Sequence, residues 1–597
     1  MRTAVEKFRF NRLRFAAFAL GLAVLVVAAH ALPEAQAPAK KAMTVDDYTK
    51  WRSIASHEIS ADGKWVAYTL QLTNTTPAEA KPVLHLLNLE TSVEVTVADA
   101  TGGTFSADSK WIAYQMDPGA AQRARANRGG AGAAAPTDSA TPPSSTAGAQ
   151  SGQGTRGGAA QNVPPRRVEL RNLGTGEVRS WQDIGTFAFS ATSTHLFLRR
   201  RGGEAAPSTG GRGGGAPSTP PTPGGTGQRA GAAGASTEPR GQDVVLLDLR
   251  TGRHQLLGSV ADIAFNRTGE LLAYTVDAAV KDANGLFVLD TRTGRTTPFD
   301  NDAKSYNRLA WNDDGNAIAV LRGSEVEKMR ERNNTLVAFP DVVSALKDGA
   351  PECTPVVLDP AKADGFPKGW VVSDRAPLAW SEDTKRVFFG MKEQVPPPDT
   401  TRRSTDEAPD VDVWNTTDER VQSAQMVRAE QDRNFTFREA FDVSAKRFVK
   451  LADETMRELD VAPDGKWAVG RDTRGYIHDD KQPTADFYRV NTSTGERTLF
   501  AKGQQTGRHA LGISPHGTHF LYWKDSKFQV YDLEANATRT LGAATPVRFI
   551  DVEFEYPGPK PSYGIAGYTS DGKAVIVNHR YDLWLLPLDG SVRTMRK

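Results

Sequence analysis

The sequence contains a single cysteine, Cys353, among its 597 residues. One cysteine allows no intramolecular disulfide, and it excludes metal or redox sites that need two thiolates. Neither sign of charge dominates, because 73 Lys and Arg residues stand against 71 Asp and Glu residues. There is also no basic stripe with interleaved aromatic residues, which argues against a nucleic-acid partner.

Long apolar runs are scarce, and the one that stands out lies near the N-terminus. Basic residues within Arg2–Arg14 precede the apolar run Phe15–Ala29, and small-residue cleavage sites follow at Ala29-His30-Ala31 and Ala35-Gln36-Ala37. The run has about 15 residues, whereas a membrane span needs about 20. We therefore expect a cleaved signal peptide rather than an anchor, and an exported protein, periplasmic or secreted, with no membrane span.

The nucleophile elbow of α/β hydrolases, Gly-x-Ser-x-Gly, is absent as well. Its nearest approaches are Gly234-Ala-Ser236 and Gly512-Ile-Ser514, where Glu238 and His516 stand in place of the second glycine. P-loop, Rossmann and EF-hand patterns are also missing. We therefore predict no catalytic residue and no cofactor in this chain.

Three histidines, His509, His516 and His519, form the single histidine group of the sequence. Nearby carboxylate ligands and helical spacing do not accompany them. We therefore predict no metal site.

What the sequence does have is a ten-residue motif that recurs nine times. It reads apolar, Ser or Asn, any residue, Asp, Gly and Lys, followed by alternating apolar positions, and we call it the signature turn. Asp and Gly supply turn chemistry, with Gly63 and Gly465 able to adopt positive φ, and the flanking positions alternate as in β-strands. The copies begin at Ile59, Phe105, Phe189, Phe265, Trp311, Trp380, Val461, Ile513 and Tyr568.

A second hairpin motif follows most copies, in which a β-rich run leads through Thr-Gly into another short strand, as at Val244–Leu257 and Leu286–Phe299. Two hairpins give four strands per repeat, and about 52 residues remain per copy once the leader and two insertions are removed. The sequence thus predicts an all-β fold, a β-propeller of seven or eight four-stranded blades with nine as the upper limit. The alternative of two stacked β-sandwiches does not account for a ninefold signature.

Four segments interrupt this pattern. Residues 119–165 and 202–242 are Gly, Ala, Pro, Ser and Thr tracts that we expect to be disordered insertions. Ser324–Gly349 and Asn415–Asn434 are charged and favour helix, so we expect helical insertions with solvated charges. The predicted organisation is a signal peptide and short linker at 1–37, first blades at 38–118, an insertion at 119–165, propeller at 166–201, an insertion at 202–242, and remaining blades at 243–597, ending mid-blade.

The repeated carboxylates and aromatic residues are interpreted as structural. Because equivalent Asp residues occupy equivalent turn positions, we predict that they form turns rather than catalyse: Asp62, Asp108, Asp314, Asp464 and Asp571. We predict that the repeated aromatic residues pack in the core: Trp65, Tyr68, Trp111, Tyr114, Trp467 and Tyr522.

Three segments resemble the propeller region of bacterial prolyl oligopeptidase family serine peptidases: Met43–Tyr68, Asp410–Asn434 and Phe554–Trp584. The resemblance implies a propeller that covers a C-terminal α/β-hydrolase domain and restricts access to short peptides. No hydrolase motif is recognisable here, so no triad residue is carried over. The Glu-Glu pair with which dipeptidyl-peptidase-like members hold a substrate amine is also absent from Asn415–Asn434.

The leading hypothesis is a non-catalytic, substrate-gating propeller of such a peptidase, with peptides or a protein partner at its funnel. The alternative is a free-standing periplasmic propeller, similar to the TolB propellers, that binds a protein or a glycan. An enzyme with its active site in the funnel is disfavoured, because no paired carboxylates occur outside turn positions.

Overall fold

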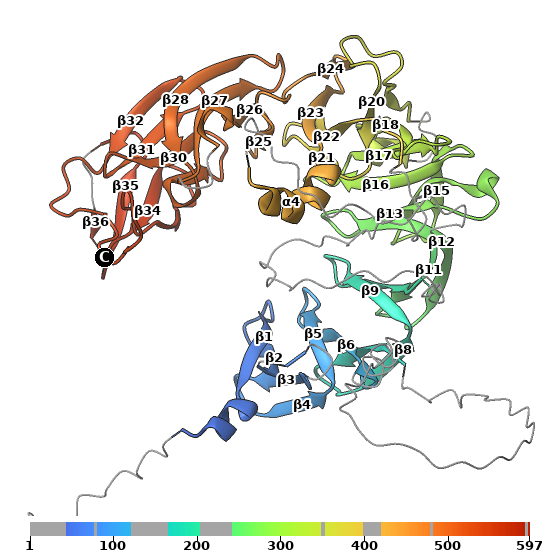
Figure 1. Cartoon of the computed structure of the whole chain (residues 1–597). Coiled ribbons are helices and arrows are strands. Elements are labelled where there is room, and N and C mark those ends of the chain that lie inside the picture. Colours follow the sequence, from blue (N-terminus) through green and yellow to red (C-terminus); the bar gives the residue numbers. More distant parts are fainter. Residues whose placement is uncertain are drawn as a thin grey trace, which may run out of the picture. The chain divides into compact units, whose positions relative to one another are not determined.

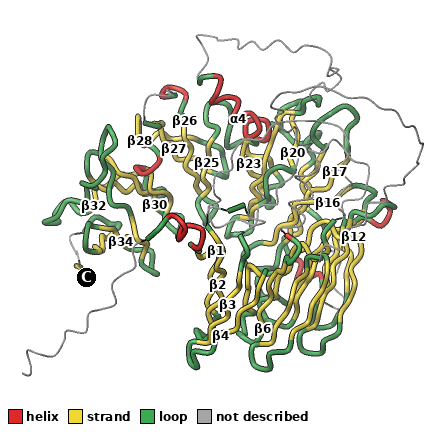
Figure 2. The backbone as a smooth tube through the Cα atoms, turned by 60° about the horizontal axis from the view of Figure 1, so that its bottom comes forward, coloured by secondary structure: helices red, strands yellow, loops and turns green. Residues whose placement is uncertain are grey.

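The computed structural model describes residues 43–73, 75–76, 80–120, 165–202, 241–347, 353–397, 420–477, 482–591 and 595–596. These residues are almost entirely strands and loops (Figure 2). They form two compact units, the first with the described residues up to Ile59, Trp65–Gly103 and 115–120, and the second with Ser60–Lys64, Thr104–Tyr114 and those from Pro165 onward. No helix in these ranges has the length and apolar character to cross a membrane.

The first unit contains a four-stranded antiparallel sheet in the order β1-β2-β3-β4, preceded by a 3-10 helix, η1. The bounds are η1 Val45–Lys50, β1 Arg52–Ile59, β2 Trp65–Leu72, β3 Val83–Asn88 and β4 Glu94–Ala98.

Eight further four-stranded repeats follow along the chain (Figure 1). Four are separate sheets, β5 to β8, β25 to β28, β29 to β32 and β33 to β36. The other four are joined in pairs: β12 serves two repeats of a seven-stranded sheet, and β20 bridges β18 and β22 in a nine-stranded sheet. The described chain therefore has nine repeats, and the prediction of an all-β fold of four-stranded, propeller-type sheets is confirmed.

The bounds from the second to the fifth repeat are β5 Ala100–Phe105, β6 Trp111–Met116, β7 Arg167–Asn172, β8 Val178–Gln182, β9 Ile184–Phe189, β10 His195–Arg200, β11 Gln242–Asp248, β12 His254–Phe265, β13 Leu271–Val276, η2 Lys281–Ala283, β14 Gly285–Asp290, β15 Thr296–Asn301, β16 Ser305–Trp311, β17 Ile318–Ser324, β18 Asn333–Phe339, α3 Val342–Ala345, β19 Val356–Leu358 and β20 Trp370–Ser373. Those of the remaining repeats are β21 Ala379–Trp380, β22 Arg386–Glu393, α4 Gln422–Asn434, β23 Phe437–Asp442, β24 Arg447–Val449, β25 Glu458–Val461, β26 Trp467–Asp472, η3 Arg474–Tyr476, β27 Thr484–Asn491, β28 Arg497–Gln505, η4 Gly507–His509, β29 Ala510–Ile513, β30 His519–Lys524, β31 Lys527–Asp532, β32 Ala537–Leu541, β33 Ile565–Tyr568, β34 Ala574–Asn578, β35 Leu583–Pro587 and β36 Met595–Arg596.

All nine signature turns occupy the same place, between the first and second strands of their repeat. The first residue of each motif is the last residue of a strand, as Ile59 is for β1 and Tyr568 is for β33. In every copy the N–H of the fifth residue donates to the carbonyl of the second at 2.8–3.0 Å. The fifth residue has φ between 55° and 73° in every copy, although Ser109, Ser193 and Thr384 stand there instead of glycine.

The Ser or Asn at the second position of the motif caps the turn from inside. Ser106 and Ser381 are each 1% exposed. In six copies the side-chain oxygen of this residue accepts the N–H of the seventh residue at 2.9–3.1 Å, as Ser381 Oγ does from Arg386, and Thr569 Oγ1 does the same in the last copy. A buried side chain thus replaces water at a backbone group that the strand ladder leaves unpaired.

Each signature turn also contacts the next turn along the chain, and we call this series the turn ladder. The N–H of Asp62 donates to Ser109 Oγ at 3.1 Å, and the N–H of Asp108 donates to Ser193 Oγ at 2.9 Å. Later steps include Asn312 Nδ2 to Thr384 Oγ1 at 2.9 Å. The contacts join turns Asp62–Ser109, Asp108–Ser193, Ala191–Gly269, Asn266–Gly315, Asn312–Thr384, Ser381–Gly465, Asp464–Gly517 and His516–Ser570.

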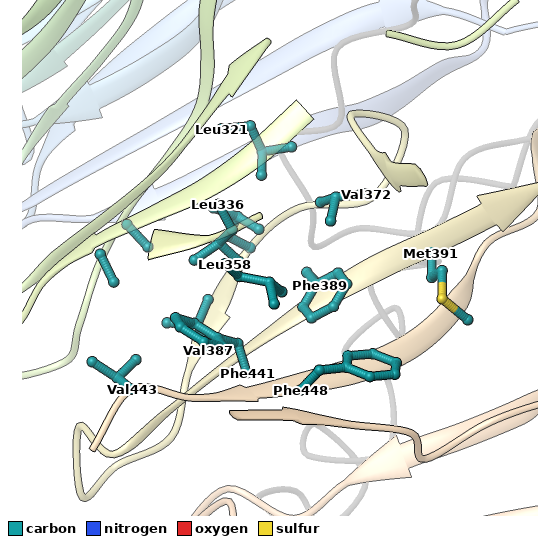
Figure 3. Close-up of a cluster of buried hydrophobic side chains, with 13 residues drawn as sticks. Leu321, Leu336, Leu358, Val372, Val387, Phe389, Met391, Phe441, Val443 and Phe448 are labelled. Carbon is teal, nitrogen blue, oxygen red and sulfur yellow. The ribbon is translucent and has the colours of Figure 1, made fainter. Parts of the chain in front are cut away.

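The two middle strands of each repeat supply the core. Figure 3 shows such a core between the fifth and sixth repeats, where Leu321 and Leu336 face Phe389 and Phe441. These four side chains are at most 1% exposed. Because successive repeats from the second to the ninth bury apolar faces against one another, stability is distributed along that series.

The two predicted helical insertions differ in outcome. Helix α4 confirms the insertion at Asn415–Asn434 over its described residues. The described part of Ser324–Gly349 has helix only at α3, and most of its centre is strand β18, where the apolar run Leu336–Phe339 lies in the core. Burial of this run outweighs the helix-favouring charges before it. The two low-complexity insertions lie mostly outside the described residues.

Substitution of Gly465 tests the turn ladder. Gly465 has φ +73°, and a Cβ there would lie 2.3 Å from Ser381 Cβ on the neighbouring turn. We expect Gly465→Ala to destabilise the chain by about 3 kcal/mol, from positive φ and the enforced separation of two turns. Urea unfolding monitored by tryptophan fluorescence measures the change.

Gly63→Ala is the matched control, because Gly63 has φ +70° but no atom within 4 Å of the added Cβ. We expect it to cost about 1 kcal/mol, from the backbone alone. Equal losses in the two variants would show that contact between turns contributes nothing.

Candidate functional site

Four of the aspartates predicted to form turns make hydrogen bonds within their turns. The carboxylates of Asp62, Asp108, Asp464 and Asp571 accept the N–H of the sixth residue of their motifs at 3.0–3.2 Å. Hydrogen bonds from the hydroxyls of Ser60 and Thr569, together with these backbone bonds, hold the pKa of Asp62 and Asp571 below the usual range. Burial instead raises the pKa of Asp464, which packs against Gly517 of the next turn.

The histidines make separate contacts. His516 Nε2 lies 3.3 Å from the carbonyl oxygen of Ser570, whereas His519 Nδ1 lies 2.8 Å from Thr518 Oγ1. His509 belongs to η4, and burial lowers its pKa. No group of three His, Cys, Asp or Glu residues suited to a metal occurs among the described residues.

Ser514 is the capping serine of the eighth signature turn, 1% exposed, with its Oγ accepting the N–H of His519. Its position in the turn explains the resemblance to an elbow. Ser236 lies outside the described residues.

The predicted core aromatics are buried to different degrees. Tyr114 and Tyr522 are buried, as expected. Trp111 and Trp467 are partly buried against neighbouring cores. The remaining two, Trp65 and Tyr68, are partly exposed; the Tyr68 hydroxyl donates to Glu94 Oε1 at 2.6 Å.

A group of cations lies at the end of the fifth and sixth repeats away from the signature turns. We define the cation cluster as Arg330, Arg375, Lys392 and Arg457. They come from four different places: the β17–β18 connection, the β20–β21 connection, strand β22, and the β24–β25 connection. In an antiparallel repeat, these positions fall at the opposite strand ends from the first-to-second-strand turn.

Glu331 is the carboxylate within this cluster, and its side chain is only 2% exposed. Its Oε1 accepts from Arg375 Nε at 2.8 Å, and its Oε2 lies 3.5 Å from Ser373 Oγ. Gln394 holds the backbone of Glu331 from both sides, accepting its N–H at 3.0 Å and donating to its carbonyl at 2.7 Å. The loop that carries Arg330 and Glu331 is thus fastened to the end of β22.

The C-terminal end of α4 meets the same cations. Asn434 Oδ1 accepts from Arg375 Nη1 at 2.7 Å and from Arg330 Nη2 at 3.3 Å. Lys392 Nζ donates to the carbonyl oxygen of Phe435 at 3.2 Å. These partners are neutral, so they orient the cations without neutralising them.

Electrostatics in the cluster are dominated by positive charge. Burial lowers the pKa of Lys392, and the guanidiniums of Arg375, Arg330 and Arg457 lower it further, while Glu331 opposes them. Glu331 is the only carboxylate within 4 Å of these cations among the described residues. The cluster therefore holds more cations than anions.

An aromatic wall borders the cluster. Phe435 and Phe437 are in edge contact with ring centroids 5.1 Å apart, and Trp370 lies 5.5 Å from Phe437. The guanidinium of Arg457 stacks over Phe435, with Cζ 4.3 Å from the ring centroid. Positive charge and apolar surface therefore adjoin at one place.

Sequence reasoning missed this cluster, since it treated the charges of Ser324–Gly349 and Asn415–Asn434 as solvated. Glu331 and Asn434 are instead held by Arg375, which is 44 and 59 residues away in sequence. No local pattern marks such a contact. The sequence feature that did point to this region was the resemblance of Asp410–Asn434 to the peptidase family.

A buried carboxyl, Glu439 on β23, lies near the cluster in sequence. It is 0% exposed; its Oε2 accepts the N–H groups of Leu451 and Ala452, while its Oε1 has no partner among the described residues. Burial raises its pKa to about 8, although these hydrogen bonds, Lys450 and Arg497 oppose the rise.

Glu439→Gln tests this burial. In the wild type the folded state keeps the proton up to about pH 8, whereas the unfolded state releases it near the ordinary glutamate pKa of 4.5. Wild-type stability should therefore fall by up to roughly 1.4 kcal/mol per pH unit across that window, relative to Glu439→Gln. Melting temperatures at pH 5 and pH 8 should separate the two proteins only at the higher pH.

Glu327→Gln provides the control for that measurement, because the Glu327 side chain is 90% exposed. It should melt as the wild type does at both values of pH. A Glu439→Gln variant that melts below wild type at pH 8 would contradict a protonated Glu439.

Comparisons with known proteins show fold similarity at low identity. No protein-family model matches the chain, and no curated protein matches it. Solved structures match as follows: the propeller domain of the trilobed protease from Pyrococcus furiosus (11% identity, 76% of this chain and 97% of that chain, TM-score 0.27), a eukaryotic initiation factor (10%, 84% and 88%, 0.36) and the acylaminoacyl peptidase of Pyrococcus horikoshii (11%, 76% and 53%, 0.28). The chain thus spans about half of that peptidase.

Proposed function

We propose that this chain is the substrate-gating propeller of a prolyl-oligopeptidase-type serine peptidase, and that it binds short peptides without cleaving them itself. The observation that carries the proposal is the cation cluster beside α4. Helix α4 lies within Asp410–Asn434, one of the segments that resemble this peptidase family. Export through a cleaved leader at 1–37 would place the chain where peptides from the surroundings reach it.

Charge counting supports binding of an anionic group. The cluster contributes four positive charges, and Glu331 contributes one negative charge. The C-terminus of α4 adds about half a negative charge. One positive charge is balanced by Glu331 and about half a charge by the C-terminus of α4, so about two and a half positive charges remain. Ion pairing and helix capping alone do not require this surplus.

The two ends of the repeats differ in what they can bind. At one end, the polar groups of the signature turns form hydrogen bonds within each turn and between neighbouring turns. At the other end, Arg330 and Lys392 donate to the neutral groups of Asn434 and Phe435, and Glu331 is the one carboxylate paired with the cluster among the described residues. A ligand-binding role therefore suits the end that carries the cation cluster.

Binding of a short peptide to the purified chain tests this proposal. We expect a fluorescein-labelled tripeptide to bind with an affinity that weakens as salt rises, because the attraction is partly electrostatic. Lys392→Gln should weaken binding about fivefold, as expected for loss of one half-buried charge. Fluorescence anisotropy measures the affinities.

Lys385→Gln is the matched control, because Lys385 belongs to the sixth repeat but lies in its signature turn and is 63% exposed. It should leave binding unchanged. Equal weakening by both substitutions, or no peptide binding at all, would overturn the proposal; a stable protein or glycan ligand in place of peptides would favour the free-standing binding module.

Hydrolysis is tested separately with chromogenic dipeptides and a fluorophosphonate probe for active-site serines. We expect neither turnover nor labelling of this chain. Robust turnover or a labelled serine would contradict the gating role.

A further inference from the structure

We propose that the cation cluster recognises the C-terminal carboxylate of a short peptide whose last residue is apolar or aromatic. This inference rests on the proposed function and names the ligand group that the site takes. It depends on two independent features of the structure, the surplus of cations and the aromatic wall.

The donors fit a carboxylate. Arg375 uses Nε for Glu331 and Nη1 for Asn434, which fixes the plane of its guanidinium. Arg330 is fixed by the same Asn434 oxygen, and its backbone N–H donates to Val395 at 2.9 Å. Guanidiniums held in fixed planes bind carboxylates through paired hydrogen bonds with little loss of side-chain entropy.

Lys392 adds a third, adjustable donor. Its ammonium donates to Phe435 O and feels Arg375, Arg330 and Arg457 as its main cationic neighbours. An incoming carboxylate would relieve this repulsion. The peptide amine would be repelled by the same charges, so orientation of the peptide follows from electrostatics.

The aromatic wall selects the residue that carries the carboxylate. Trp370 and Phe435 are half-buried and border the cations, whereas Phe437 behind them is buried. An apolar side chain next to the carboxylate would cover these rings and exclude water from the charges. Inorganic phosphate has the charge but no apolar side chain to cover the rings. Cations beside an aromatic wall therefore favour the C-terminus of a peptide over phosphate.

Matched peptides test the inference. N-acetyl-Ala-Ala-Phe with a free C-terminal carboxylate is compared with the same peptide as its C-terminal amide, by calorimetric titration of the full chain. We expect the acid to bind at least about tenfold more tightly than the amide, which is typical of a charge-assisted pair. Replacing Phe by Gly in the acid should weaken binding severalfold.

Two variants, one that removes a negative charge from the cluster and one that removes a positive charge, should change binding in opposite directions. Glu331→Gln removes the competing carboxylate and should tighten binding of the acid severalfold while leaving the amide unchanged. Arg375→Gln should remove most of the preference for the acid. Because it leaves Glu331 unpaired, the double variant Glu331→Gln/Arg375→Gln is measured as well, and it too should lack the preference.

Arg292→Gln is the control for loss of an arginine, since Arg292 is 67% exposed in the fourth repeat. Equal binding of acid and amide, both weakened by Lys392→Gln, would overturn the carboxylate assignment and leave the proposed function standing. Binding of neither peptide would overturn both. Displacement of the acid by inorganic phosphate at equal concentration would overturn the peptide assignment.

Discussion

Contact between successive signature turns is the constraint on which the remaining structure depends. Eight of the nine turns carry a Ser, Asn or Thr at the second position, the seventh having Ala462 instead, and all nine have a left-handed residue at the fifth position. Neighbouring turns are joined by polar or glycine contacts. The first two turns, Ser60–Lys64 and Thr104–Tyr114, group with the second compact unit rather than with their own flanking strands in the first. Within the second compact unit, the ladder thus joins each turn to the next, and apolar cores lie between neighbouring repeats.

Much of this fold was predictable from sequence because the turn chemistry is local. A capping residue and alternating apolar positions within ten residues mark the same hairpin, so the weak copy at Phe189, which has Ser190 but neither the Asp nor the Gly, was also found. The helix expected across Ser324–Gly349 was wrong over most of its length, because packing of Leu336–Phe339 between two sheets decides its conformation. Such packing depends on strands distant in sequence, and no local pattern contains it.

The candidate site was not predictable for the same reason. Arg330, Arg375 and Arg457 come from three separate connections and Lys392 from strand β22, and each alone resembles a surface charge. Only the fold brings them around Glu331 and the end of α4. The two ends of the repeats thus have different roles. The end with the signature turns stabilises the fold, and the opposite end, whose sequence differs from repeat to repeat, carries the charges available to a ligand.

Mapping of a bound peptide tests this division of roles most directly. A short peptide with a photoreactive benzophenone side chain at its last residue is cross-linked to the full chain, and the site is read by mass spectrometry. The account predicts cross-links within residues 370–375, 391–394 and 434–437, close to the cation cluster and its aromatic wall. Cross-links confined to the signature turns, or spread evenly over the repeats, would contradict it.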